Sequence, residues 1–148
     1  MKRNKNIIVT GAAGFIGSNL VKELNKCGIE NITMVDHLTD EKKKNIQGLK
    51  YKEYLDKDEF LKMIKGNKFT NIGLIFHLGA RTDTAEQNKE FLLKVNTEYS
   101  KNLFLFARLN NCRFIYASSA ATYGDGSNGY SDKERNLKPL NYYGLSKY

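Results

Sequence analysis

The sequence predicts an α/β protein built on a doubly wound parallel sheet. Short apolar segments alternate along the chain with amphipathic segments of helical period. A glycine-rich turn joins the first apolar segment to the first helical one, and an acidic residue ends the next apolar segment. Parallel strands joined by right-handed crossover helices produce this order. With 148 residues and no repeat or linker, the chain is expected to form one domain, residues 1–148.

The strand–helix order can be followed from the N-terminus. Residues 6–10 are a short apolar strand, and residues 15–27 are a helix with Ile16, Leu20 and Leu24 on one stripe. Gly28 is a natural helix stop. The remaining expected strands are 31–35, a weakly patterned 50–54, 72–77 and 113–117.

The remaining helices follow the same apolar spacing. They are expected at 56–65, 86–110 and 141–148, while Lys42, Lys43 and Lys44 fall in a stretch expected to be flexible. A loop rich in Gly, Ser, Asp and Asn spans 124–136. The strand at 113–117 is expected to be an exposed sheet edge.

Composition narrows the class of partner. The formal net charge is +8, but the lysines are scattered along expected helices, which favours an anionic small molecule over nucleic acid. No apolar run is long enough to cross a bilayer, and the basic N-terminus precedes only a short apolar run, so no membrane partner and a cytoplasmic location are expected. No metal-ligand spacing is present, and Cys27 and Cys112 are expected to be buried free thiols.

The glycine-rich turn has the spacing of a phosphate-binding loop. Gly11 permits a tight turn, Gly14 allows the backbone to approach a pyrophosphate, and Gly17 allows close packing of the helix. The helix that starts at Phe15, with Ile16 in its first turn, then presents free N–H groups and its positive dipole end to the phosphates. A preceding strand and a following amphipathic helix strengthen this prediction.

The acid at the end of the second strand bears on the cofactor. Asp36 is placed to accept hydrogen bonds from a ribose hydroxyl, which favours NAD. Lys42, Lys43 and Lys44 follow and can neutralise a 2′-phosphate. Both NADP and NAD therefore stay open, with a lean toward NADP.

Two further strand ends provide candidate site residues. His77-Leu78-Gly79-Ala80 leaves room for a ligand at the carboxyl edge of the sheet, and Asn96 can hydrogen-bond this loop. Ser118-Ser119 ends the strand at 113–117 at the same edge.

Tyr143 and Lys147 occupy positions i and i+4, which share one helix face. An ordinary tyrosine is a poor base near neutrality, and a nearby ammonium favours its phenolate. In this interpretation Ser119 orients a substrate oxygen, Tyr143 removes a hydroxyl proton and Lys147 also holds the nicotinamide ribose.

Taken together, these motifs resemble the extended short-chain dehydrogenase/reductase superfamily, whose nucleotide-binding domain is Rossmann-like. Within its epimerase/dehydratase members, the segments Ala80–Thr84, Tyr116–Gly124 and Pro139–Lys147 are most similar to ADP-glycero-manno-heptose 6-epimerases, and only to their N-terminal part. That resemblance implies a nucleotide-sugar isomerase of carbohydrate and lipopolysaccharide metabolism. Such enzymes use tightly held NADP, oxidise a sugar carbon transiently and return the hydride to the opposite face.

The resemblance also implies roles for individual residues. Lys43 and Lys57 would meet the adenosine end of the cofactor, while Thr82 and Ser119 would contact substrate. The full cofactor-binding set is Gly11, Gly14, Phe15, Ile16, Gly17, Asp36, His37, Lys43, Lys57, Leu78, Gly79, Ala80, Asn96 and Lys147. His37 departs from the asparagine that is frequent in the family, and the 50–54 region lacks its usual acid, for which Glu53 can substitute.

Length is the largest departure from the family. The resembling chains are about twice as long and include further strands and a substrate domain, so residues 1–148 are expected to bind cofactor and to be catalytically weak. Family-type homo-oligomers would pair the helix at 86–110 and the one that begins at Asn141, and are expected to be weakened.

Two other functions remain open at this point. A nucleotide-sugar 4-epimerase or 4,6-dehydratase fragment is the nearest alternative, although Ala120-Ala121-Thr122 lacks the acid pair common in dehydratases. A non-catalytic dinucleotide-binding regulator or scaffold is the alternative of another class. The coincidence of Ser119, Tyr143 and Lys147 favours the enzyme.

Overall fold

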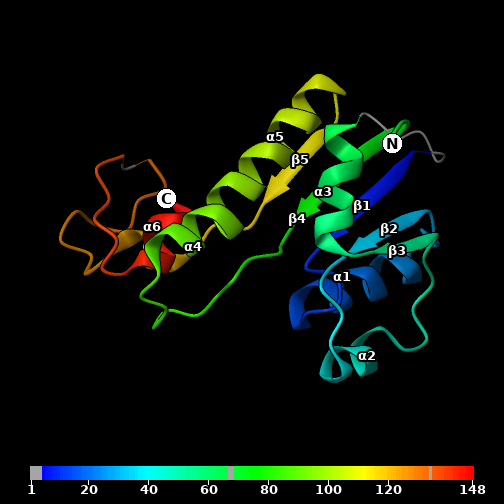
Figure 1. The fold of residues 1–148 in the computed structure, drawn as a ribbon, viewed down its shortest axis with the longest axis horizontal. Coiled ribbons are helices and arrows are strands. Elements are labelled where there is room, and N and C mark those ends of the chain that lie inside the picture. The colour runs from blue at the N-terminus through cyan, green and yellow to red at the C-terminus, as the bar shows by residue number, and fades with distance from the viewer. Residues whose placement is uncertain (1–4, 67–68, 134) are drawn as a thin grey trace. The chain divides into compact units, whose positions relative to one another are not determined.

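The fold is a five-stranded parallel sheet with helices in its connections. The computed structural model describes residues 5–66, 69–133 and 135–148. The strands are β1 (Asn6–Thr10), β2 (Ile32–Val35), β3 (Glu53–Leu55), β4 (Ile72–His77) and β5 (Arg113–Tyr116). Their order across the sheet is β3-β2-β1-β4-β5, and every adjacent pair is parallel (Figure 1). The predicted parallel α/β class is confirmed.

Contacts within the chain separate it into two compact units, each described by itself below. Unit 1 consists of residues 1–79 and 102–116 and includes the whole sheet. Unit 2 consists of residues 80–101 and 117–148.

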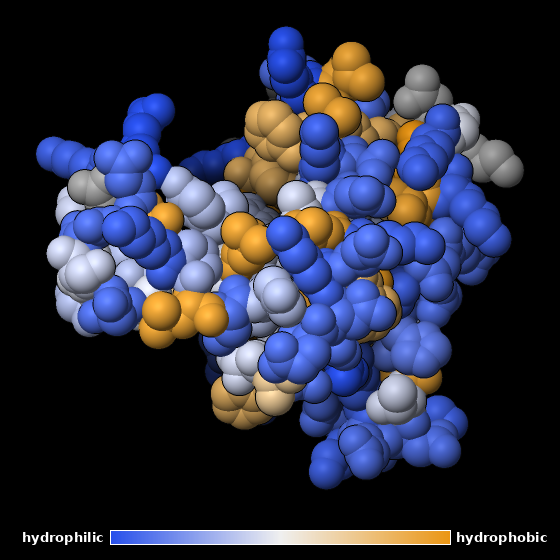
Figure 2. Space-filling model, turned by 60° about the vertical axis from the view of Figure 1, so that its left-hand side comes forward, coloured by the Kyte–Doolittle hydropathy of each residue, from blue (hydrophilic) through white to orange (hydrophobic). Residues whose placement is uncertain are grey.

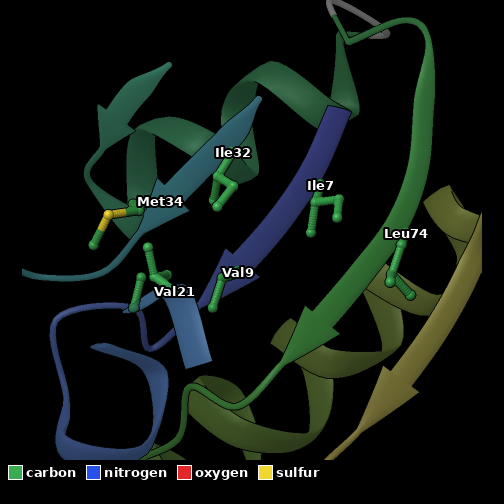
Figure 3. Close-up of a cluster of buried hydrophobic side chains, with 7 residues drawn as sticks. Ile7, Val9, Val21, Ile32, Met34 and Leu74 are labelled. Carbon is green, nitrogen blue, oxygen red and sulfur yellow. The ribbon is translucent and has the colours of Figure 1, made fainter. Parts of the chain in front are cut away.

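The core of unit 1 is built on the central strand. Ile7 lies opposite Ile32 of β2 and Leu74 of β4, and Val9 lies opposite Met34. Figure 3 shows these side chains in one layer, with Val21 of α1 (Phe15–Lys26) approaching Val9 and Met34. All of β1 and β2 is buried, as expected for strands of a parallel sheet covered on both faces.

The helices agree with the expected ones except at two places. Besides α1, the chain forms α2 (Asp40–Ile46), α3 (Lys57–Lys65), α4 (Lys89–Leu92), α5 (Tyr99–Leu109) and α6 (Tyr142–Lys147). A short 3-10 helix, η2, spans Ala120–Tyr123. The prediction of a flexible stretch around Lys42–Lys44 is wrong, because these residues belong to α2.

The predicted long helix is interrupted by a different helical form. The six residues Leu93–Glu98, labelled η1, form a π-helix between α4 and α5. The helical region also starts at Lys89 rather than at residue 86, because the Asn88 side chain accepts a hydrogen bond from the N–H of Phe91 and caps α4. A π-helical turn inside an α-helix is frequent at functional sites.

Hydrophilic residues dominate one face of the surface. Figure 2 shows the face it presents covered mostly by hydrophilic residues, with separate hydrophobic groups between them. Across the described ranges, no helix combines the length and apolar character of a membrane span. Of the two cysteines, Cys27 is exposed as the C-cap of α1 and Cys112 is half-buried, so their expected full burial is wrong.

Candidate functional site

The glycine-rich turn in unit 1 is packed too closely for side chains. Gly11 has a φ of +68°, and a Cβ there would lie 2.7 Å from the backbone N of Gly79. A Cβ on Gly17 would lie 2.1 Å from the carbonyl oxygen of Gly11. The turn, the start of α1 and the end of β4 therefore meet through backbone alone.

The start of α1 is open to a ligand. Its N-cap, Gly14, provides no side-chain hydrogen bond to the first turn. The side chains of Phe15 and Ile16 are 83% and 68% exposed, so they leave the helix terminus uncovered by their own packing. The first N–H groups of a helix have no partner within it, and they bind anions readily.

The glycine-rich turn Gly11–Gly17 and the adjacent Leu78-Gly79 backbone are called the phosphate cradle below. A buried hydroxyl links the ends of β1 and β4 at this cradle. The Oγ1 atom of Thr10 lies 2.6 Å from Nδ1 of His77 and accepts a hydrogen bond from the N–H of Gly79 at 3.2 Å. His77 is buried and stacks on Tyr116. The Leu78-Gly79 backbone is thereby fixed beside Gly11, and sequence reasoning did not single out Thr10.

Asp36 is held by three groups at the end of β2. Its Oδ2 accepts from the N–H of Ala13 at 3.0 Å, and its Oδ1 accepts from the N–H of His37 and from Nζ of Lys42 at 2.8 Å. Lys42 also donates to the carbonyl of His37. The carboxylate is thus joined to the phosphate cradle and neutralised by a lysine.

The other residues predicted for the adenosine end lie on α2, α3 and the loop before α2. Lys43 pairs with Asp40 at 2.7 Å and Lys57 with Asp58 at 2.9 Å, both at the surface. Nδ1 of His37 lies 3.3 Å from Oδ2 of Asp56, the N-cap of α3.

Asp56 is itself held in the ionised form. Partial burial opposes ionisation, but the N–H of Asp58 and the His37 ring outweigh it, so the pKa of Asp56 lies below its ordinary value.

In unit 2, Asn96 holds the segment that follows Gly79-Ala80. Its Oδ1 accepts from the N–H of Arg81 at 2.8 Å, and its Nδ2 donates to the carbonyl of Arg81 at 3.0 Å. The sequence predicted that Asn96 would hydrogen-bond the His77–Ala80 loop. In the structure it bonds Arg81, the residue directly after that loop. Thr82, expected to contact substrate, is exposed in the same segment.

Tyr143 and Lys147 are both buried on α6. Asn141 caps this helix, since its side chain accepts from the N–H of Gly144 at 2.7 Å. Tyr143 is 9% exposed and Lys147 is 6% exposed. Burial lowers the pKa of Lys147 to about 8, which places its proton exchange close to neutral pH.

Ser119 caps the 3-10 helix that packs against α6. Its hydroxyl accepts from the N–H of Ala121 at 3.2 Å. A Cβ on Gly144 would lie 2.5 Å from the carbonyl oxygen of Ala121, so only glycine lets α6 approach η2 this closely. A cavity of about 460 Å³ beside Ser119 is lined also by Tyr123 and Asp132, which hydrogen-bond each other at 2.5 Å.

Two residues of this region were not anticipated from the sequence. Ser146 accepts from Nδ2 of Asn96 at 2.8 Å, and Thr97 donates to the carbonyl of Ser146 at 2.8 Å. Their positions next to Asn96 and Lys147 were the available signal.

The fold and the glycine-rich cradle define a Rossmann-like dinucleotide-binding protein. The model of the NAD dependent epimerase/dehydratase family matches residues 7–148, and the chain belongs to that family. It is 45% identical over 148 residues to an ADP-L-glycero-D-manno-heptose-6-epimerase of Brachyspira hyodysenteriae, covering 96% of this chain and 46% of that protein.

Solved structures agree with this assignment. The ADP-L-glycero-D-manno-heptose-6-epimerase of Helicobacter pylori superposes with a TM-score of 0.82 at 31% identity, covering 98% of this chain and 48% of that one. MoeE5 in complex with UDP-glucose and NAD gives a TM-score of 0.75 at 29% identity, covering 96% and 45%. The chain thus spans about half the length of the relatives it matches.

Proposed function

We propose that residues 1–148 are the dinucleotide-binding domain of a nucleotide-sugar epimerase similar to the ADP-glycero-manno-heptose 6-epimerases. The substrate domain would come from residues outside this range. The observation that supports an enzyme rather than a binding scaffold is the burial of Tyr143 and Lys147 on one short helix, packed against the turn that Ser119 caps.

These three side chains suit the removal and return of a hydroxyl proton. The Ser119 hydroxyl would hydrogen-bond the sugar oxygen and orient it. Tyr143 would accept the hydroxyl proton as the neighbouring carbon loses its hydride, and would return the proton after the hydride comes back to the other face. The dinucleotide, when bound, supplies the hydride acceptor.

Lys147 would contribute charge to this step. With a pKa of about 8 it is mostly protonated at neutral pH, so it would carry a positive charge there. By family resemblance it would also hold the nicotinamide ribose.

The contacts of Asp36 favour NADP within this proposal. An unpaired carboxylate would repel a 2′-phosphate, but Lys42 pairs with Asp36 at 2.8 Å and cancels its charge. Asp36 keeps acceptor capacity, since an ionised carboxylate has about four lone-pair positions. The turn at Gly11–Gly17 would hold the pyrophosphate.

Cofactor binding can be tested with two matched glycine variants. Gly11 and Gly28 both have positive φ, +68° and +74°, but nothing lies within 4 Å of a Cβ built on Gly28. Gly11→Ala is expected to abolish NADPH binding measured by fluorescence titration, whereas Gly28→Ala keeps it. Equal binding by both variants would contradict the cradle assignment.

The chemistry requires a separate assay. Chain 1–148 loaded with NADP should give at most slow sugar-dependent formation of NADPH with ADP-heptose, and Tyr143→Phe should give none. If NADPH forms with UDP-sugars but not with ADP-heptose, the protein is closer in function to the 4-epimerases. Tight cofactor binding with no reduction of the bound NADP by any nucleotide sugar, even after the C-terminal half of a relative is added, would favour a regulator.

Location and assembly complete the proposal. We propose a cytoplasmic location, because the cofactor and nucleotide sugars are cytoplasmic metabolites; cell fractionation tests it.

We also propose weak self-association through α5, whose Phe104, Leu105 and Leu109 are exposed. Sedimentation of the parent chain and of Leu109→Lys should differ at high concentration if α5 is the contact.

A further inference from the structure

The helix that bears Tyr143 and Lys147 is too short to position itself. α6 has six residues, and helices of this length are marginal in water without packing. Its backbone is closed by few bonds, including Leu145 N–H to Asn141 and Tyr148 N–H to Gly144. Groups outside the helix must therefore fix where its side chains lie.

One such group is the side-chain amide of Asn96. Its Nδ2 donates a hydrogen bond to the hydroxyl of Ser146 at 2.8 Å, and that hydroxyl in turn donates one to the carbonyl of Tyr143 at 2.8 Å. Ser146 is 3% exposed and Asn96 is 1% exposed, so both bonds are shielded from water. Because hydrogen bonds strengthen one another in a dry environment, these two linked bonds fix the backbone at Tyr143 to the π-helical turn.

A second group is the hydroxyl of Thr97. It donates to the carbonyl of Ser146 at 2.8 Å, directly before Lys147. Asn96 and Thr97 are adjacent residues of η1, and both bond to Ser146, one to its side chain and one to its backbone. The π-helical turn thus contacts the last turn of α6 at two points.

The opposite side of the helix is fixed by close packing. Gly144 lies against the carbonyl of Ala121 and the ring of Pro139, with space for no side chain. α6 is therefore restrained from η1 on one side and from η2 on the other.

We propose that Thr97 and Ser146 are positioning residues that fasten α6 to the π-helical turn and so set the placement of Tyr143 and Lys147. The importance of that placement rests on the proposed function, because acid–base chemistry depends on ångström-level geometry. The fastening itself can be measured without any turnover.

Thr97 offers a clean substitution because it is an exposed residue. Thr97→Val keeps the shape and removes the donor, while Thr97→Ser keeps the donor. The first readout is the titration midpoint of Lys147, followed by NMR of ¹³C-labelled lysine and assigned with Lys147→Arg. The second is amide hydrogen exchange at Leu145 and Tyr148, with β1 amides as the internal reference.

In Thr97→Val the Lys147 midpoint should rise from about 8 toward the ordinary 10.5 as water reaches the amine. Exchange at the two α6 amides should accelerate about tenfold, the size expected for one lost hydrogen bond. β1 amides should be unchanged, and Thr97→Ser should resemble the parent chain.

The idea is overturned if Thr97→Val matches the parent in both readouts, if Thr97→Ser is as altered as Thr97→Val, or if β1 exchange changes equally. Should Thr97→Val fail to fold, Ser146→Ala is judged by the same criteria. Failure of the parent chain to bind NADPH would refute the proposed function while leaving this test intact.

Discussion

At the scale of single residues, the cofactor preference depends on one ion pair. Lys42 and Asp36 have side chains that are only 33% and 10% exposed, so water screens their attraction less than at an open surface. The carboxylate is also fixed by the N–H of Ala13, which belongs to the phosphate cradle. A change at Lys42 therefore alters the charge that a ribose or its 2′-phosphate meets.

Lys42→Ala should weaken NADP binding more than NAD binding. Loss of the ammonium leaves Asp36 to repel the 2′-phosphate, and the ratio of the two dissociation constants should move toward NAD by about tenfold, or 1.4 kcal/mol. Isothermal titration with each cofactor measures this ratio. Lys44→Ala is the matched control, since Lys44 lies on the same helix and forms no ion pair within the described ranges. Identical effects of the two variants would remove Lys42 from cofactor selection.

Lys147 illustrates a residue that is costly to the fold. Its pKa of about 8 lies below the ordinary 10.5, because burial disfavours the charged form. Between those two pH values the unfolded chain binds more protons at this site than the folded one, so stability should rise with pH across the window. Below pH 8 the full penalty remains, about 3 kcal/mol by linkage.

Lys147→Met should therefore stabilise the chain at pH 7, by up to about 3 kcal/mol, and should remove the part of the pH dependence between 8 and 10.5 that Lys147 causes. Urea unfolding of both proteins at pH 7, 8, 9 and 10 gives the comparison. A Met variant that is less stable than the parent at pH 7 would mean that Lys147 makes interactions that exceed its burial penalty.

The site residues that the sequence predicts best are glycines at positions where the backbone leaves no room for a side chain. Gly11 and Gly17 occupy positions where a Cβ collides with backbone, and that requirement leaves a glycine in the sequence. Thr10, Thr97 and Ser146 act through one hydroxyl each, and hydroxyl residues are common in every environment. Their roles became visible only when their partners, far away in the chain, were placed beside them.

At the scale of elements, α2 shows where pattern reasoning fails. Its sequence, Asp-Glu-Lys-Lys-Lys-Asn-Ile, has no apolar stripe, and the helix buries no residue. Acids in its first turn and lysines in its last suit the helix dipole, and Ile46 at its end packs against the core cluster. The π-helical turn η1 was equally hidden, because its extra residue disturbs the apolar spacing too little to be noticed.

The packing of α6 gives an element-scale prediction with an unusual sign. Glycine to alanine inside a helix normally stabilises by about 1 kcal/mol. Gly144→Ala should instead destabilise by about 1–3 kcal/mol, because the new methyl group collides with the carbonyl of Ala121. Thermal unfolding measures the sign, and exchange at the Tyr148 amide shows whether α6 is the part displaced. A stabilised variant would show that α6 is free to shift away from η2.

At the scale of the whole molecule, the candidate residues divide between two units. The glycine-rich turn, Asp36 and Leu78-Gly79 belong to unit 1, while Asn96, Ser119, Tyr143 and Lys147 belong to unit 2. The sequence predicts one domain over residues 1–148, and none of the three points at which the chain passes from one unit to the other lies in a Gly- or Pro-rich linker. The division follows from contacts between distant segments, which no local pattern reveals.

Cofactor should stabilise unit 1 whatever the chemistry of unit 2. With NADPH at 100 times its dissociation constant, the free energy of unfolding should rise by about 2.7 kcal/mol. Amide exchange should slow first at Ala13 to Gly17 and around Asp36. Hydrogen-exchange mass spectrometry with and without NADPH tests this, with NADH as a comparison; protection confined to residues 117–148 would place the nucleotide elsewhere.

The order of strands also determines how this chain can fold as it is made. β1 is synthesised first, yet it is the middle strand of the sheet, between β2 and β4. Its pairing with β2 needs only the nearby α1 crossover, whereas its other edge stays unpaired until Ile72–His77 has left the ribosome. Long-range parallel pairing is slow, and an open apolar edge is prone to aggregation in the meantime. The nascent chain therefore passes through a stage in which its central strand, fully buried in the final fold, has one partner and needs protection on the other side.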